Sequence, residues 1–314
     1  MAIYKGNKKV VAVYKGSTPI NKIYKGSTLV FQKSGGGGST HLFEGTATSN
    51  FDLKINNNQT IPITPDADGK WFYDTDEELT TLTNLFGSSM SSSAVTSVDL
   101  SNLDLTGINA SNMFFTASNI TSIKFNNTKS MKLVDVGGMF YGCESLTSLD
   151  LSSFDTSNIS SLENLFGNCR SLVSLNLSSF NTSNVRHVSS LFYRCSSLVS
   201  LDLSSFDTSN VASANSLFSG CSSLVSVDLS NWNMSRLMYA SGLFQGCSSL
   251  VSIDLSSFVI KQYGTYNDMF KDCTSLSTIK CKQAFKDWCI TNQDMIGLPT
   301  AMREGGSGTW EIVA

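Results

Sequence analysis

Six of the eight cysteines recur every 26 residues, which raises the question of disulfide or metal chemistry; they are Cys143, Cys169, Cys195, Cys221, Cys247 and Cys273. A zinc site needs four converging ligands, usually in closely spaced pairs, whereas this period supplies one thiol per repeat. Parallel stacked side chains do not easily reach the dihedral angle of a disulfide. Ser89 and Ala117 occupy the same slot in two further repeats. The pattern therefore favours small, buried core residues, and the alternative is a pairing of Cys281 or Cys289 with Cys273.

Carboxylates form a second column at one position of the repeat, and its members are Asp99, Asp150, Asp202, Asp228 and Asp254, with Asn176, Lys124 and Lys280 at equivalent positions. Carboxylates about 5 Å apart repel one another, so either solvent screens them or a cation such as Ca²⁺ bridges them. A uniform stripe offers no contrasting environments to separate the pKa values of a catalytic acid and base. With only His41 and His187, the serines lack a nearby base. We therefore expect a solvated face, no cofactor and no enzyme activity.

The elements that position these columns follow from the repeat itself, because the hydrophobic period changes within each unit. Leu198, Leu201 and Leu203 show the L-x-x-L-x-L pattern of a leucine-rich-repeat strand. This strand recurs eight times, centred on Val98, Ile123, Leu149, Leu175, Leu201, Val227, Ile253 and Ile279. The spacing from Val185 to Cys195 predicts a short helix or 3₁₀ turn. The expected fold is an α/β leucine-rich-repeat solenoid of eight units of about 26 residues, with a parallel sheet.

Single positions of the unit carry further expectations. Ser183 and Asn184, with their equivalents, suit either helix N-caps or a stacked asparagine ladder. Trp232 replaces the phenylalanine of other units and is expected in the core.

Both ends of the repeat stack are expected to be covered, because open ends of a repeat array expose apolar surface. Residues 41–80 read as a β-rich N-terminal cap, with strands over 51–55, 60–63 and from Lys70, and a turn at Asp68-Gly69. The repeats themselves occupy 81–282. Residues 283–314 form a C-terminal cap made of a helix over 283–289, a glycine-rich turn and a strand over 309–313.

The first 33 residues form a basic arm with its own repeat, in which a Tyr-Lys-Gly motif recurs every ten residues. The arm holds seven lysines and no acid, so it carries +7 and the rest of the chain −10. Such short β-hairpins do not bury enough surface to fold alone. We predict a docking or assembly arm, with solubility of exposed strands as the alternative. Its candidate contact residues are Tyr4, Lys5, Tyr14, Lys15, Tyr24 and Lys25.

Residues 34–40, Ser-Gly-Gly-Gly-Gly-Ser-Thr, predict a flexible tether that spans about 15 Å. We favour a natural linker, because composition and repeat type change across it, over an engineered scar.

Specificity is expected where the repeats differ, because identical positions serve stacking. The differing pairs after the asparagine slot, all expected to be exposed, are Ser160-Ser161, Arg186-His187, Ala212-Ser213, Met238-Tyr239 and Gly264-Thr265. Aromatic and arginine side chains are favoured as contact hot spots. The candidate receptor contacts are therefore Arg186, His187, Tyr193, Arg194, Met238 and Tyr239. The alternative is ordinary variation of an outer surface.

Composition excludes several classes of function. A net charge of −3 and a pI near 5.4 argue against nucleic acid as a partner, because phosphate binding needs a concentrated basic face. No apolar run is long enough to span a membrane, so membrane insertion is not expected. Lysines and glycines interrupt the first residues, which does not fit a secretory signal.

Two parts of the chain resemble known families. The unit L-F-x-x-C-x-S-L-x-S-L-D-L-S-S-F-x-T-S-N-V, over residues 80–282, resembles BspA-type leucine-rich-repeat surface proteins, with their mycoplasma lipoprotein repeats. This resemblance implies a curved solenoid with an adhesive, surface-exposed role. The Tyr-Lys-Gly tandem resembles the starts of virion proteins, often tail or fibre components, of phages of gut bacteria.

Together these resemblances favour a non-enzymatic phage virion component that is assembled in the host cytoplasm. Its arm would bind virion structural proteins, its solenoid would attach to a host surface glycan or protein, and it would occur as a homo-oligomer or in several copies. The alternative is a BspA-type adhesin on the bacterial surface, and an enzyme ranks last.

Overall fold

The computed structural model describes residues 14–15, 18–19, 22–25, 28–32, 43–55, 59–74, 82–86, 94–103, 105–125 and 131–313. Within the arm, β1 (Tyr14–Lys15) pairs antiparallel with β2 (Thr18–Pro19). β3 (Lys22–Lys25) pairs antiparallel with β4 (Thr28–Gln32), which confirms the predicted pairing of short strands here. Tyr4, Lys5 and the tether at 34–40 lie outside the described residues.

A small sheet precedes the repeats, and its strand order is β10-β9-β5-β8. β5 (Phe43–Ala47), which the sequence did not predict, pairs antiparallel with both β8 (Lys70–Tyr73) and β9 (Val95–Leu100). β6 (Phe51–Ile55) and β7 (Gln59–Ile63) form a separate hairpin near the predicted bounds. Strand β5 therefore continues the sheet of the first repeats and covers its edge, as a cap must.

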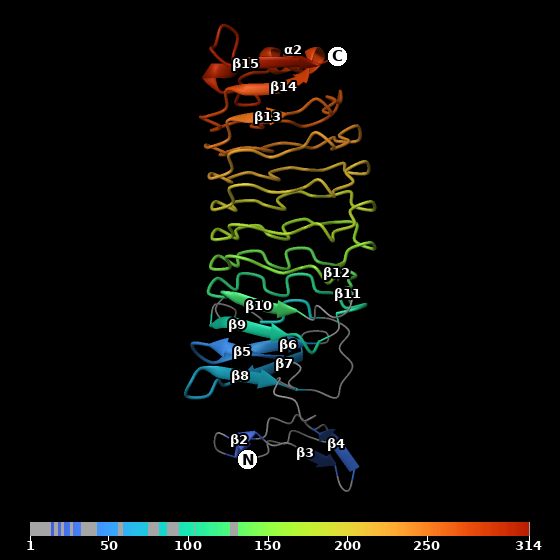
Figure 1. Cartoon of the computed structure of the whole chain (residues 1–314), viewed down its shortest axis with the longest axis vertical. Helices are drawn as coiled ribbons and strands as arrows, with labels where there is room; N and C mark the ends of the chain where they lie inside the picture. The colour runs from blue at the N-terminus through green and yellow to red at the C-terminus, as the bar shows by residue number, and fades with distance from the viewer. Residues whose placement is uncertain are drawn as a thin grey trace.

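The rest of the chain winds through successive coils that lie one above another, which gives a long repeat-type stack (Figure 1). Parallel strands mark the two ends of one side: β9 with β10 (Ser122–Phe125), and β13 (Ser252–Asp254) with β14 (Thr278–Lys282). A further short parallel pair, β11 (Met131–Lys132) and β12 (Phe154–Asp155), lies elsewhere on the coils.

The interior of the stack is a set of continuous columns with one residue from each coil. The phenylalanine just before the cysteine slot stacks on its equivalents from Phe114 to Phe270, with neighbouring ring centroids 5.6–6.0 Å apart and nearly parallel planes. The six repeating cysteines and Ala117 are buried beside them. Trp232 is also buried and stacks on Phe206, as predicted for a core residue. Offset and stacked aromatic packing of this kind adds to the burial of apolar area.

Two predictions about the unit are wrong in detail. Four of the eight expected strands, those centred on Leu149, Leu175, Leu201 and Val227, are not continuous strands, because hydrogen bonds between coils there are isolated. The short helix or 3₁₀ turn expected before each cysteine is a run of separate tight turns, each closed by an N–H to the carbonyl oxygen three residues earlier, as from Tyr193 to Ser190. Ser190 and Arg194 adopt positive φ angles of 56° and 55°, which an α-helix does not tolerate. In the part of the chain that the structure describes, α2 is the only α-helix.

The C-terminal elements match the expectation closely. Helix α2 (Gln283–Thr291) buries Phe285 and Cys289, and a 3₁₀ turn, η1 (Thr300–Met302), follows it. Strand β15 (Thr309–Val313) then pairs parallel with β14 and becomes the outer strand of the last sheet.

Candidate functional site

The carboxylate column serves the backbone of its own coil. In the five aspartates and in Asn176, the Oδ1 atom accepts the backbone N–H of the serine two residues later. The N–O distances are 2.9–3.0 Å, from the first pair, Asp99 with Ser101, to the last, Asp254 with Ser256. For Asp202 and Asp228, hydrogen bonds from the side chain and backbone of the following serine lower the carboxyl pKa. Lysines pair with the column at both ends, Lys124 with Asp99 at 3.3 Å and Lys280 with Asp254 at 2.8 Å. These are turn-forming residues.

The cysteine column is a structural ladder with one feature that spacing did not predict. Each thiol donates a hydrogen bond to the carbonyl oxygen of the phenylalanine 29 residues earlier, for example Cys195 Sγ to Phe166 O at 3.1 Å. Burial raises the pKa of Cys195 to about 12, so the thiol stays protonated. All eight cysteines are free and buried. Among the described residues, no group of three or more His, Cys, Asp or Glu is arranged to hold a metal ion.

The predicted receptor contacts lie on the outer surface, in two places. His187 and Tyr239 belong to one column, in which bridges connect His187 to Ser213 and Ser213 to Tyr239. Arg186 and His187 are exposed, Tyr239 is 45% exposed and Met238 is half-buried. Ser213, expected to be exposed, is buried and bonded to the Ser189 hydroxyl at 2.7 Å. This column therefore does not bring the two candidate pairs into contact, because Ser213 separates His187 from Tyr239.

Tyr193 and Arg194 form the second place. The Arg194 guanidinium lies 5.1 Å from the centroid of the Tyr193 ring, and the arginine is exposed while the tyrosine is half-buried. The arginine is therefore available to a partner but already held against its neighbour. Of the arm candidates, Tyr14 and Lys15 lie in β1, and Tyr24 and Lys25 lie in β3.

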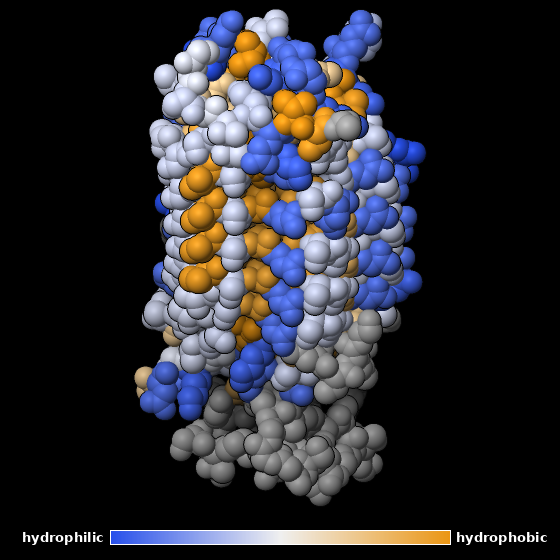
Figure 2. Space-filling view, turned by 45° about the horizontal axis from the view of Figure 1, so that its top comes forward, coloured by the Kyte–Doolittle hydropathy of each residue, from blue (hydrophilic) through white to orange (hydrophobic). Residues whose placement is uncertain are grey.

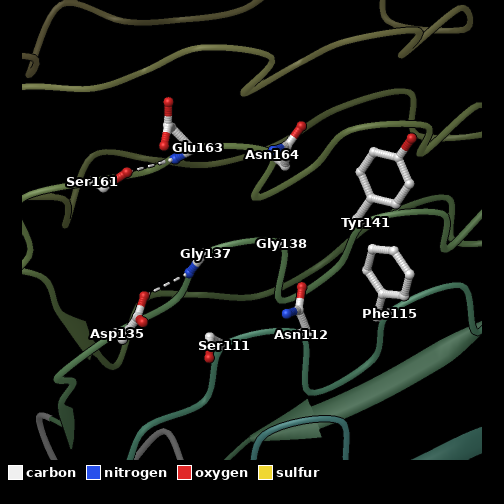
Figure 3. Close-up of a pocket in the computed structure, with 10 residues that line it drawn as sticks. All are labelled: Ser111, Asn112, Phe115, Asp135, Gly137, Gly138, Tyr141, Ser161, Glu163 and Asn164. Carbon is white, nitrogen blue, oxygen red and sulfur yellow. Dashed lines mark hydrogen bonds between the residues drawn. The ribbon is translucent and has the colours of Figure 1, made fainter.

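A hollow of about 620 Å³ lies on three successive coils and is lined by none of the residues predicted as receptor contacts, although Ser161 in its lining is bridged to His187. Figure 3 shows its lining, in which Asn112 and Asn164 lie on either side of Gly138 and the two rings of Phe115 and Tyr141 form one wall. The other lining residues are Ser111, Asp135, Gly137, Ser161 and Glu163. The hollow therefore combines carboxylates, amides, hydroxyls and aromatic rings within one small area.

Two adjacent glycines produce this hollow. In the six other units from 111 to 268, the slot of Gly137 holds Ser, Glu or Asn, and only here do Gly137 and Gly138 follow one another. A Cβ on Gly137 would lie 3.4 Å from Asp135 Oδ1, an ordinary contact, so a side chain would fit and would occupy the hollow. Gly138 has a φ of +59°, and a Cβ there would collide with the Asn112 side chain.

The floor of the hollow is rigid backbone. Asn112 N–H donates to Gly137 O at 2.8 Å, and Gly138 N–H donates to Glu163 O at 3.0 Å. Asp135 Oδ1 accepts the Gly137 N–H at 3.0 Å, and the Ser161 hydroxyl accepts the Glu163 N–H at 3.3 Å (Figure 3). The backbone and the Asp135 and Ser161 side chains are thus held before any ligand arrives, which lowers the entropic cost of binding. The sequence signal that was missed is the Gly-Gly pair at a slot where other units carry a side chain.

One long hydrophobic stripe is also exposed on the leucine side. Val173, Val199, Val225 and Val251 are each 45–53% exposed at one position of successive units. Figure 2 shows columns of hydrophobic and hydrophilic residues running side by side along the stack.

Comparison with known proteins gives one result. The model of the family described as "Mycoplasma protein of unknown function, DUF285" matches residues 80–200 and again 173–288, which covers the repeats. It does not reach the basic arm, so the resemblance of the Tyr-Lys-Gly tandem to virion proteins gains no support. No curated protein and no solved structure matches the chain. In the described residues no helix combines the length and apolarity that crossing a membrane requires. Because the match spans more than half of the sequence, the chain belongs to the DUF285 family.

Proposed function

We propose that this protein is a non-enzymatic, surface-associated adhesion protein of the BspA type, whose repeats form an eight-unit leucine-rich-repeat solenoid that binds a host surface glycan or protein. The observation that carries the proposal is the double family match over residues 80–288. A virion tail or fibre role, which rested on the arm, is not supported by that match.

The distribution of variation along the stack supports a binding role. The inner columns keep the same residue type from coil to coil, as in the stacked phenylalanines and buried cysteines. The outer positions change, as in the column Ser161, His187, Ser213, Tyr239 and Thr265. A repeat fold that keeps its interior constant and varies its outer surface suits recognition of a partner by an extended face.

The test is adhesion of the purified full chain to host epithelial cells and to immobilised extracellular matrix proteins. We expect saturable binding that a chain without residues 1–33 retains, because the arm is proposed to serve assembly rather than recognition. Absence of saturable binding to both surfaces contradicts the proposal.

The predicted contacts are tested in the same assay. Replacing Arg186, His187 and Arg194 with alanine removes exposed polar contacts without touching the core, and Tyr239→Ser removes the exposed ring. If these residues form the binding surface, affinity falls about tenfold or more, as for hot-spot residues. Exchange of Ser157 for alanine, elsewhere on the coil surface, is the matched control. If all of these variants bind as the wild type does, the predicted receptor contacts have no role in binding.

A further inference from the structure

We propose that the hollow between Asn112 and Asn164 is a binding site for an uncharged saccharide, a hexose or N-acetylhexosamine at the end of a glycan chain. The inference rests on the proposed adhesive function and names the ligand class and the site. Its basis is the combination of a preformed hollow, paired hydrogen-bonding side chains and an aromatic wall on three neighbouring coils (Figure 3).

The shape of the hollow depends on one coil that departs from the repeat. Gly137 leaves empty the volume that Ser111, Ser189 and Ser241 fill at the same slot. The hollow holds about 620 Å³, within the range of sites for small ligands and large enough for one or two sugar rings. Its floor is tied by hydrogen bonds between coils, so the site needs little rearrangement to accept a ligand.

The polar groups match the hydroxyls of a sugar, each of which both donates and accepts hydrogen bonds. Asp135 and Glu163 present carboxylate oxygens that accept. Asn112 and Asn164 present amides that donate and accept, from coils on either side of Gly138. The hollow thus combines carboxylate acceptors with amides that both donate and accept.

The aromatic wall supplies the apolar contact that a sugar's C–H groups need. The rings of Phe115 and Tyr141 are stacked with centroids 5.1 Å apart. Phe115 is 41% exposed, and the Tyr141 hydroxyl accepts a hydrogen bond from the Asn168 amide at 3.0 Å, which fixes that ring. A fixed, partly exposed aromatic pair beside polar groups is the usual composition of a ligand site.

Charge restricts the ligand further. The ten lining residues include two carboxylates and no Lys, Arg or His. Sialylated and sulfated glycans would meet uncompensated negative charge, so they are disfavoured. Among the described residues no group of three or more His, Cys, Asp or Glu is arranged to hold a metal ion, so a bare cation is not the expected ligand. The uncharged sugar is therefore the ligand class that satisfies all of the side chains.

The experiment measures binding of the full chain to a printed array of neutral, sialylated and sulfated oligosaccharides, followed by calorimetric titration with the best neutral sugar. The diagnostic variant is Gly137→Ser, which restores the residue found at this slot in other units and so keeps the fold. We expect its affinity to fall at least about tenfold, a difference of about 1.4 kcal/mol. Phe115→Ser, which installs the residue of Ser219 at the equivalent slot, is expected to weaken binding as well.

The matched control is Ser241→Asn, which enlarges the side chain at the same slot on a coil outside the hollow, as Asn215 and Asn267 do naturally. It should bind like the wild type. Equal binding by Gly137→Ser overturns the inference, and so does binding to sialylated or sulfated glycans without binding to neutral ones.

Cell adhesion separates this inference from the proposed function. If the wild type adheres to cells while the array stays blank, the saccharide site is wrong and the adhesive role stands. If the wild type neither adheres nor binds the array, the adhesive role and the saccharide site are both overturned.

Discussion

The two sides of each coil are held to their neighbours in different ways. Before the cysteine, every second N–H points to the next coil, as from Ser190 to Asn215 O at 2.8 Å and from Arg194 to Ser219 O at 2.7 Å. The N–H groups between them close tight turns within the coil, as from Tyr193 to Ser190 O at 3.2 Å. On the leucine side of the middle coils, between the paired strands at the two ends, the connections are isolated, for example Val225 N–H to Val199 O at 3.2 Å.

This difference indicates that one side of each coil determines the spacing between successive coils and that the other side adapts to it. The cysteine side combines a regular backbone ladder with stacked rings and thiol hydrogen bonds, so register is specified there. The leucine side depends on burial of apolar side chains, which is non-directional and tolerates irregular backbone. Substitutions on the two sides should therefore differ in cost, and the following predictions test that difference.

The largest effect is expected for Phe192→Ala. Its ring lies between those of Phe166 and Phe218, at 5.9 and 5.8 Å, and is fully buried. The free energy of unfolding should fall by about 3–5 kcal/mol, as for other buried aromatic residues. Urea denaturation followed by circular dichroism measures it, with the exposed Val199→Ala as control. A loss below about 1 kcal/mol would show that the ring column does not hold the coils.

A smaller loss, about 1–2 kcal/mol, is expected for Cys195→Ala, because the change removes the hydrogen bond to Phe166 O and leaves a small cavity. Ala117 shows that the slot accepts alanine. The same denaturation experiment measures the loss. No loss at all would mean that neither the hydrogen bond nor the volume of the thiol stabilises the stack.

Alkaline pH should reduce the difference in unfolding free energy between the wild type and Cys195→Ala. The pKa of Cys195 is raised by burial from 9.0 to about 12, so the folded state holds a proton that the unfolded state loses first. The stability from this shift is fully present below pH 9 and is lost as the pH rises toward 12. The gap between wild type and Cys195→Ala should therefore narrow between pH 8 and pH 11. A constant gap would contradict burial of the thiol.

A second pH dependence, at acidic pH, is expected for Asp207. The side-chain and backbone hydrogen bonds of Ser209 lower the pKa of its carboxyl group below 3.8. The stability from this shift is present above the unfolded value and is lost as the pH falls through the folded value. Asp207→Asn keeps the turn, as Asn181 does with Ser183 at 3.1 Å, but does not titrate. The wild type should lose stability relative to this variant below about pH 4, measured by thermal denaturation.

The smallest effect is expected for Val199→Thr in the exposed valine stripe. The side chain is 49% exposed, so the free energy of unfolding should change by no more than about 0.5 kcal/mol. Thr147 already occupies this position in another unit. A large loss would show that the leucine side carries more of the stack's stability than its hydrogen bonds indicate.

Periodicity predicted the parts of the fold that depend on burial. The cysteine slot, Trp232 in the core, helix α2 and strand β15 follow from apolar spacing and lie where expected. Asn184 also donates to Ser157 O in the preceding coil at 2.8 Å, as a stacked asparagine ladder requires. These features repeat, and repetition makes a pattern visible in a single sequence.

Backbone conformation was not visible in the same way. The spacing from Val185 to Cys195 resembles a helix because residues three or four apart share a face in the tight turns too. The positive φ angles at Ser190 and Arg194 leave a signal only when the units are compared: the equivalent positions hold mostly Asn, Gly or Asp, for example Asn164 and Gly220, and these residue types tolerate positive φ. The hollow was not predicted because contact sites are expected at large exposed side chains, whereas Gly137 creates space by having no side chain.

The backbone hydrogen bonds that join one coil to the next repeat along the stack, so each coil is an equivalent structural unit. A gene with near-identical units exchanges, duplicates and deletes them readily, and each such event changes the stack by a whole step without disturbing its neighbours. Lineages can therefore lengthen the molecule beyond Glu163 while the sugar pocket keeps its chemistry. The length of the protein and its ligand specificity can then evolve separately.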